Sequence, residues 1–251
     1  KLLMSDQSNF DQYRRRFLGG SVATVAGMAL APGVLLHEIA HAKPADQAVS
    51  SDVRWGMLID SNKCAEGCND CVTACNDEHG LTGFDRPATD AQWIRKVTLK
   101  DKETGYTQTL PLLCQHCEKP PCVDVCPTGA SFRREDGIVL VDKHICIGCR
   151  YCMMACPYKA RSFIHETLQD QKPYAPRGKG TVESCTFCVH RVDNDETPAC
   201  VEACTAENHN AMLFGDLNDP SSAISQQLKQ HNSRQIRADL QLNTGVRYRG
   251  I

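Results

Sequence analysis

The sequence predicts an α+β fold in which short strands and short helices surround several metal-binding loops. The first reason is the cysteine content, because the 251-residue chain contains 16 cysteines. The second is their distribution into four groups of four, with none left over. The third is that short apolar or alternating stretches, bounded by glycine, proline or aspartate, lie between the groups, as β-strands do. The fold is therefore expected to form around the cysteine loops.

Residues 1–42 are expected to be a twin-arginine export signal. Residues 14–18 (RRRFL) match the core of that signal. A weakly apolar stretch follows, and residues 40–42 (AHA) match an A-x-A cleavage site, which predicts a mature start at Lys43. The alternative is an uncleaved membrane anchor, because the stretch approaches the ~20 residues that span a bilayer. Its glycines and Pro32 make it a poor anchor, so cleavage is favoured.

The first predicted structural elements after the signal are a strand and a hairpin. Residues 55–60 (WGMLID) read as a strand that leads into the first cysteine group. Residues 93–99 alternate, and residues 106–113 can return alongside them after a turn at 101–105. This arrangement predicts a β-hairpin between the first and second groups.

Three further elements are predicted in the second half of the chain. Residues 137–142 (GIVLVD) form a strand before the third cysteine group, and residues 212–216 form a strand that closes the cysteine-rich region. Asp219 and Pro220 are typical of a helix N-cap followed by proline, which predicts a helix to about Gln230. The polar residues that follow are expected to cover the surface as a tail.

The spacing of the four cysteine groups is typical of iron–sulfur sites. The third group is C-x2-C-x2-C-x3-C-P, the run in which three thiolates hold one [4Fe–4S] cluster and the fourth reaches a second. The others are C-x3-C-x2-C-x3-C, C-x2-C-x4-C-x3-C-P and C-x2-C-x11-C-x3-C. With four thiolates per cluster, four [4Fe–4S] clusters are predicted. In chain order the groups are Cys64, Cys68, Cys71, Cys75; Cys114, Cys117, Cys122, Cys126; Cys146, Cys149, Cys152, Cys156; and Cys185, Cys188, Cys200, Cys204.

Three other uses of these cysteines are less consistent with the pattern. A disulfide scaffold suits shorter secreted chains than this one. Structural zinc favours paired C-x2-C sites, but zinc motifs rarely crowd four cysteines so closely, and two groups here end in Cys-Pro. Covalent haem requires C-x-x-C-H, which no group contains.

The charge and the hydropathy of the chain argue against direct binding to nucleic acid or insertion into a membrane. The formal net charge is −2, and no basic cluster of the kind that binds nucleic acid is present. No segment after residue 42 approaches the length of a transmembrane helix. Work at a membrane would therefore require a partner protein.

The sequence resembles the four-cluster iron–sulfur subunits of the DMSO reductase and NrfC type. The resemblance lies in residues 114–122 (CQHCEKPPC), 126–130 (CPTGA), and 214–217 (FGDL) followed by Asp219 and Pro220. Within that family the chain is most similar to the periplasmic DsrO-type subunits of the Dsr transmembrane complex, which is linked to dissimilatory sulfite reductase. Four stretches carry this second resemblance, residues 54–60, 161–163, 176–180 and 243–248.

The family resemblance implies crossed ligation, in which each cluster takes three cysteines from one group and one from another. The first group departs from the family by one extra residue among Ala65, Glu66 and Gly67, and Gly67 has the backbone freedom to absorb it. The implied sets are Cys64, Cys68, Cys71 with Cys204; Cys185, Cys188, Cys200 with Cys75; Cys114, Cys117, Cys122 with Cys156; and Cys146, Cys149, Cys152 with Cys126.

The fold expected from these observations is α+β, with two interleaved bacterial dicluster ferredoxin-like modules around four [4Fe–4S] clusters. Short strands, short helices and one β-hairpin insertion would complete it. The expected division is 1–42, export signal; 43–113, first cysteine group and hairpin; 114–160, central dicluster module; 161–216, fourth group, paired with the first; and 217–251, C-terminal helix and surface tail.

The expected function is electron transfer by a non-enzymatic subunit, with no catalytic residue and no small-molecule substrate on this chain. His116 and His190 adjoin cysteines and are expected to pack around the clusters. The resemblance implies a periplasmic subunit held at the membrane by an NrfD-like integral membrane protein, with a multihaem cytochrome c and further membrane subunits as partners. The alternative is the electron-transfer subunit of a molybdopterin oxidoreductase or an NrfC-type nitrite reduction system.

Overall fold

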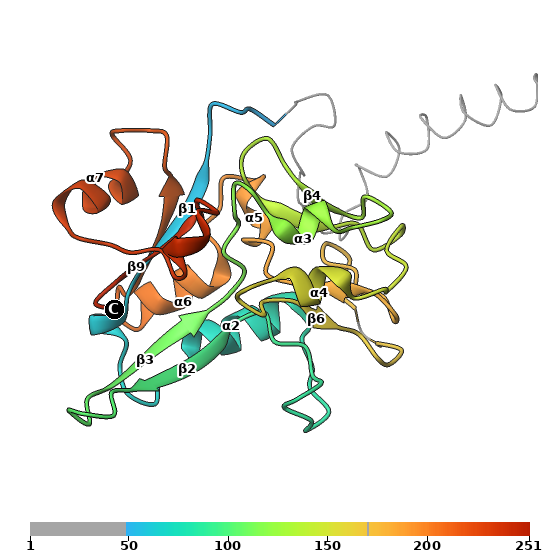
Figure 1. The fold of residues 1–251 in the computed structure, drawn as a ribbon, viewed down its shortest axis with the longest axis horizontal. Helices are drawn as coiled ribbons and strands as arrows, with labels where there is room; N and C mark the ends of the chain where they lie inside the picture. Colours follow the sequence, from blue (N-terminus) through green and yellow to red (C-terminus); the bar gives the residue numbers. More distant parts are fainter. Residues whose placement is uncertain (1–48, 170) are drawn as a thin grey trace, which may run out of the picture. The chain divides into compact units, whose positions relative to one another are not determined.

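The computed structural model describes residues 49–169 and 171–251, so the predicted export signal lies outside the described residues. Within those two ranges, no helix is both long enough and apolar enough to cross a membrane. Figure 1 shows short strands and helices joined by long loops. The elements are β1 Trp55–Asp60, η2 Ser61–Lys63, α2 Asp70–His79, β2 Arg95–Lys100, β3 Thr107–Leu112, α3 Pro121–Asp124, β4 Ser131–Arg133, β5 Val139–Val141, α4 Tyr151–Ala155, β6 Ser162–Phe163, β7 Val182–Glu183, α5 Val189–Val192, α6 Ala199–Ala206, β8 Met212–Asp216, α7 Ala223–Gln230, η3 Ala238–Leu240 and β9 Val246–Arg249.

A three-stranded sheet joins segments that are far apart in the sequence. Its order is β8-β1-β9, with β8 antiparallel and β9 parallel to the central strand β1. Met57 and Ile59 of β1 are fully buried, while Trp55 stacks on Phe214 of β8 with ring centroids 5.2 Å apart. The predictions of strands at 55–60 and 212–216 are therefore confirmed.

The expectation that the C-terminal residues form a surface tail is wrong for β9. Val246 and Tyr248 are fully buried, because the strand alternates apolar and basic residues and turns the apolar ones inward. The Tyr248 hydroxyl donates to the carbonyl of Pro111 at 3.1 Å and accepts from Gln115 Nε2 at 3.1 Å. The short run of two buried residues among polar neighbours gave too weak a periodic signal to be recognised as a strand.

The predicted helix after Asp219 starts later than expected. Helix α7 begins at Ala223, and its N-cap is Ser222, whose hydroxyl accepts from the Ser225 amide at 3.2 Å. Asp219 instead accepts from the amide and hydroxyl of Ser221, which forms a turn ahead of the helix. A serine side chain competes well for the N-cap position, so the Asp-Pro signal marked the turn rather than the cap.

The remaining strands form three two-stranded ladders. The predicted hairpin is confirmed as β2 paired antiparallel with β3, closed by a turn in which Asp101 N–H donates to the Tyr106 carbonyl at 2.8 Å. The predicted strand at 137–142 is present as β5, which pairs with β4. The β6–β7 pair was not predicted, because two-residue strands carry no periodic signal. The α+β class is thus confirmed.

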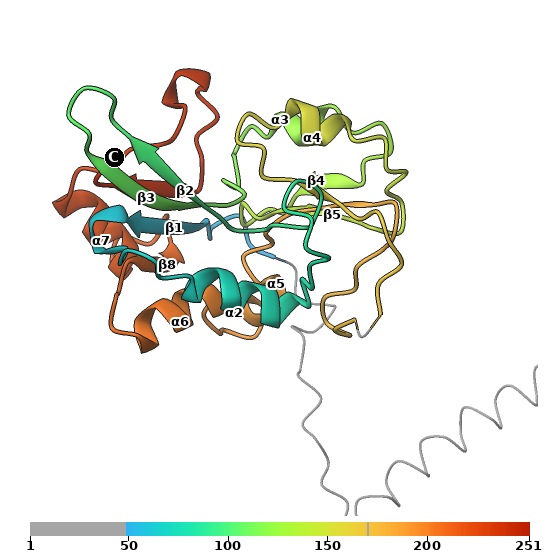
Figure 2. The same ribbon diagram turned by 90° about the horizontal axis from the view of Figure 1, so that it is seen from below.

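The short helices pack in two pairs, and each pair joins two cysteine groups. Helix α2, from the first group, contacts α6, from the fourth, and α3, from the second, contacts α4, from the third. Figure 2 shows the second pair beside β4 and β5, and the first pair near β1 and β8. These helix pairs determine which cysteines come together.

The Tyr248 hydroxyl provides a test of the C-terminal strand. We expect Tyr248→Phe to lower the stability by about 1–2 kcal/mol, because two buried hydrogen-bonding groups lose their partner. The measurement is the apparent melting midpoint of the iron-loaded protein at a fixed scan rate. Tyr106→Phe is the matched control, since the Tyr106 side chain is exposed. Equal midpoints for the two variants would contradict the buried role of Tyr248.

Candidate iron–sulfur sites

Two helices each carry a pair of cysteines four residues apart. The two members of a pair share one face of the helix but belong to different sites. Cys71 and Cys75 lie on α2, and Cys200 and Cys204 lie on α6. Residues at i and i+4 share a helix face, separated by about 6 Å along the axis. One sulfur of each pair therefore reaches one site, and the other reaches the neighbouring site.

The first set, here called site A, contains Cys64, Cys68, Cys71 and Cys204. The four line one pocket, together with Lys96 from β2. Burial raises the pKa of Cys71 to about 11, and nearby Cys64 and Cys68 add to the effect, whereas Lys96 opposes it. Gly67 has a φ of 74°, which shows that the loop uses the conformational freedom of glycine between Cys64 and Cys68.

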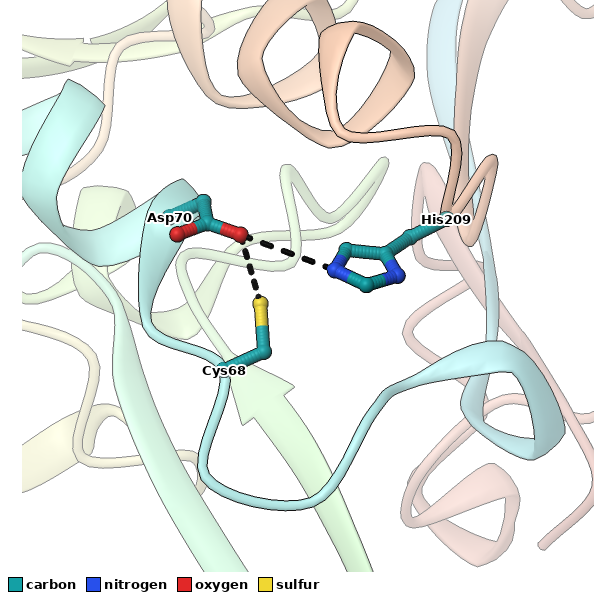
Figure 3. A group of neighbouring side chains, drawn as sticks. All are labelled: Cys68, Asp70 and His209. Carbon is teal, nitrogen blue, oxygen red and sulfur yellow. Dashed lines mark hydrogen bonds and ion pairs between the residues drawn. The ribbon is translucent and has the colours of Figure 1, made fainter.

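Cys68, like Cys64, is only partly buried, whereas the other two cysteines of site A are buried. Figure 3 shows the Cys68 thiol and the His209 ring both directed at the same oxygen of Asp70. The Cys68 thiol donates to Asp70 Oδ2 at 2.9 Å, and His209 Nε2 lies 3.7 Å from the same oxygen. The ligand-bearing atoms of these three side chains lie within 4.8 Å of one another. The loop that carries the extra residue thus holds its thiol at the rim of the pocket.

The second set, site B, contains Cys75, Cys185, Cys188 and Cys200, all buried. Burial raises the pKa of Cys75 strongly, and the nearby charges of Cys200 and Cys188 raise it further. His79, on the last turn of α2, lies 3.3 Å through Nε2 from Cys188 Sγ. Burial lowers the pKa of His79 to about 3, so the ring is neutral at pH 7.

The third set, site C, contains Cys114, Cys117, Cys122 and Cys156, all buried. Burial raises the pKa of Cys117, and the other three thiols of the set raise it further. His116 lies between the first two cysteines and stacks on Phe187, with ring centroids 3.6 Å apart. Because Phe187 lies between two cysteines of site B, this stack joins sites B and C.

The fourth set, site D, contains Cys126, Cys146, Cys149 and Cys152, which line one pocket. Cys149 is exposed, unlike every other cysteine of the chain. The turn between Cys146 and Cys149 depends on Gly148, which has a φ of 70°. A Cβ on Gly148 would collide with the carbonyl oxygen of Gly180 and lie 3.2 Å from the Phe163 ring.

The four sets fit iron–sulfur clusters by their donor chemistry. Each offers four thiols in a confined space, and thiolate is the ligand type that selects iron–sulfur clusters, zinc and Cu(I). Four neighbouring thiolates repel one another, so a cationic centre must compensate them. The loop between Cys114 and Cys117 also contains a buried ring nitrogen. His116 accepts from the Val139 amide at Nδ1, which leaves its Nε2 proton without a protein acceptor among the described residues.

The two histidines predicted to pack near the cysteines have different surroundings. His116 packs as expected beside site C. His190 contacts no thiol among the described residues, and instead pairs with Glu78 at 2.7 Å and stacks on Tyr174. His79 was not predicted, although its position four residues after Cys75 in a helix is a signal that it shares the cysteine face.

Gly148 provides a test of the site D loop. We expect Gly148→Ala to reduce the iron content and to destabilise the loop, because the added carbon collides with the Gly180 backbone. Gly129→Ala is the matched control, since Gly129 has the same φ of 70° but open space around it. The control should cost only about 1–2 kcal/mol of backbone strain and keep its iron. Equal iron loss in both variants would contradict the packing argument.

Comparison with known proteins identifies the family to which the chain belongs. The 4Fe-4S dicluster domain matches residues 105–217 and, in a second form, residues 63–130. The Hdr-like menaquinol oxidoreductase iron-sulfur subunit 1 of Archaeoglobus fulgidus is 40% identical over 262 residues, covering 94% of this chain and 97% of that protein.

Two further relatives extend the comparison. A tetrathionate reductase subunit of Salmonella typhimurium is 39% identical over 227 residues, covering 89% of this chain and 81% of that protein. Protein NrfC of Escherichia coli is 39% identical over 180 residues, covering 71% and 72%. The similarity to the Archaeoglobus protein spans nearly the whole of both chains. The chain therefore belongs to the family of 4Fe-4S dicluster iron–sulfur subunits, the electron-transfer subunits of redox complexes.

Proposed function

We propose that the chain carries four [4Fe–4S] clusters, one in each of sites A to D, and passes single electrons along them. The observation that carries this proposal is that each helix pair contributes to two adjacent thiol sets. The ligands would be Cys64, Cys68, Cys71 and Cys204 in site A; Cys185, Cys188, Cys200 and Cys75 in site B; Cys114, Cys117, Cys122 and Cys156 in site C; and Cys146, Cys149, Cys152 and Cys126 in site D.

The contacts between sites support a linear order, A-B-C-D, in two interleaved modules. Cys71 of site A is near enough to Cys200 of site B to raise its pKa, after the larger effect of burial. The stack of His116 on Phe187 joins B to C. Cys152 of site D likewise acts on Cys122 of site C. An electron would thus enter at one end, near Cys68 or Cys149, and leave at the other.

The protein side chains would hold the clusters, exclude water and tune the potentials. The clusters supply one-electron redox chemistry when bound. Buried apolar side chains such as Ile138 and Val139, which pack with cysteines of site C, would exclude water from that site. His79 directs Nε2 toward Cys188 Sγ of site B, and hydrogen bonds to sulfur raise a cluster's reduction potential. We assign no catalytic residue and no small-molecule substrate to this chain.

Iron analysis and the replacement of a single cysteine ligand test the crossed arrangement. The purified protein should contain sixteen irons and sixteen labile sulfides, four per site. Cys156→Ser should alter the EPR signal of the cluster held by Cys114, Cys117 and Cys122. Cys126→Ser is the matched control and should alter only the signal of site D. A total near eight irons would refute the four-cluster proposal, and a Cys156→Ser effect confined to site D would refute the crossing.

We further propose that the protein works in the periplasm as the electron-transfer subunit of a quinone-linked membrane complex of the Dsr type. The RRRFL motif and A-H-A site support export by the twin-arginine route. An NrfD-like integral membrane subunit would hold the protein at the membrane, and a multihaem cytochrome c would be its redox partner. The Archaeoglobus relative supports the quinone link, because its name describes a menaquinol oxidoreductase.

The alternative is an electron-transfer subunit of a molybdopterin oxidoreductase or an NrfC-type nitrite reduction system. Relatives named as subunits of tetrathionate reductase and of arsenate respiratory reductase support it. In that assembly a large catalytic subunit would accept or supply the electrons, and the four clusters would have the same role.

Purification of the complex from membranes distinguishes the two assemblies. With an affinity tag on the C-terminus of this chain, we expect an integral membrane subunit and covalently bound haem to co-purify. Mass spectrometry identifies the subunits, and haem and molybdenum assays identify the cofactors. Molybdenum in stoichiometric amount, without covalent haem, would overturn the Dsr-type proposal and support the alternative.

A further inference from the structure

Arg161 is a buried cation for which the described residues offer no carboxylate. Arg161 is 5% exposed, and its Nη2 donates to Cys122 Sγ at 3.1 Å. Nε and Nη1 are buried and have no hydrogen-bond partner among the described residues. An isolated buried charge costs several kcal/mol unless it is paired, so this guanidinium must have acceptors.

Arg177 shows how the same fold satisfies a buried arginine by ordinary means. It is 6% exposed, and its Nη2 and Nε donate to the two carboxylate oxygens of Glu183 at 2.7 and 2.9 Å. Arg161 lacks any such ion pair in the described part of the chain. The contrast indicates that its counter-charge comes from the thiolates and from what they bind.

Arg161 lies between sites C and D. Cys122 of site C, which accepts from Arg161 Nη2, packs with Cys152 of site D in one buried cluster. The residue comes five positions after Cys156 and directly before β6, whose pairing with β7 fixes the backbone at this point. The guanidinium is therefore held in place, near thiols of two different sites.

We propose that Arg161 is a shared hydrogen-bond donor and counter-cation for the clusters of sites C and D, and that it raises the reduction potentials of both. This inference rests on the proposed function, because it requires clusters in those two sites. The free Nε and Nη1 protons would be donated to cluster or cysteine sulfur, as Nη2 is donated to Cys122. Arg161 is a potential-tuning residue and not a catalytic one.

The physical reason is electrostatic. Reduction adds one negative charge to a cluster, and a fixed positive charge within hydrogen-bonding distance stabilises the reduced form more than the oxidised form. The interaction is strong because Arg161 is buried and poorly screened by salt. One cation between two centres favours an electron on either of them, so its removal should lower two potentials together.

The test is a redox titration of the purified full-length protein, followed by EPR. Arg161→Gln removes the charge, and we expect the potentials assigned to sites C and D to become more negative, while those of A and B stay unchanged. Arg161→Lys keeps the charge but loses the several N–H donors of the guanidinium. The potentials of sites C and D should therefore shift less than with Arg161→Gln. Where Arg161→Gln retains fewer than sixteen irons, Arg161→Lys provides the measurement.

Arg150→Gln is the matched control. Arg150 adjoins Cys149 and lies 3.8 Å above the Phe163 ring, but it is exposed to solvent. Loss of this screened charge should shift site D alone, and less than Arg161→Gln does. Unchanged potentials in an Arg161 variant with sixteen irons, or a shift of one cluster only, would overturn the shared role. Fewer than sixteen irons in the unaltered protein would instead refute the proposed function.

Discussion

The geometry of a single helical turn controls the arrangement of the cysteine sites. Cysteines four residues apart on α2 and on α6 share a face, yet their backbone positions are separated by about 6 Å along the axis. Neighbouring sites must therefore be built by the same helices, and neither can move without the other. The contact of α2 with α6 follows from this constraint. Helices α3 and α4, which also contact each other, carry one cysteine each, Cys122 of site C and Cys152 of site D.

The cysteine pattern allowed the site to be predicted in more detail than the rest of the fold. Strands at 55–60 and 212–216 agree with β1 and β8 to the residue, because each is a short apolar run with clear boundaries. Two of the thiol sets that the family resemblance implied, those of sites A and D, each line one pocket, and the assignment of ligands stays a prediction. Spacing alone gave the number of sites, but it did not determine which groups exchange a cysteine.

Elements that depend on distant partners were not predictable from local sequence. Strand β9 has only two buried residues, and its burial depends on β1 and on Gln115, far away in the chain. The contact of His79 with Cys188 and that of Arg161 with Cys122 likewise join separate groups. Hydrophobic periodicity reports which residues face a core, but not which distant residue they meet there. The prediction of the α7 N-cap was wrong for a local reason, because Ser222 and Asp219 both suit that position.

The parallel pairing of β1 with β9 has a consequence for biosynthesis. β1 spans residues 55–60 and its partner spans 246–249, so the ribosome must translate nearly all of the described chain before the sheet can close. Gly245, next to β9, also hydrogen-bonds to the carbonyls of Gln115 and His116 within the loop that bears Cys114 and Cys117. Contacts of such long sequence separation form late in folding. The Cys114–Cys117 loop therefore lacks its hydrogen bonds to Gly245 until the segment that carries β9 has been translated.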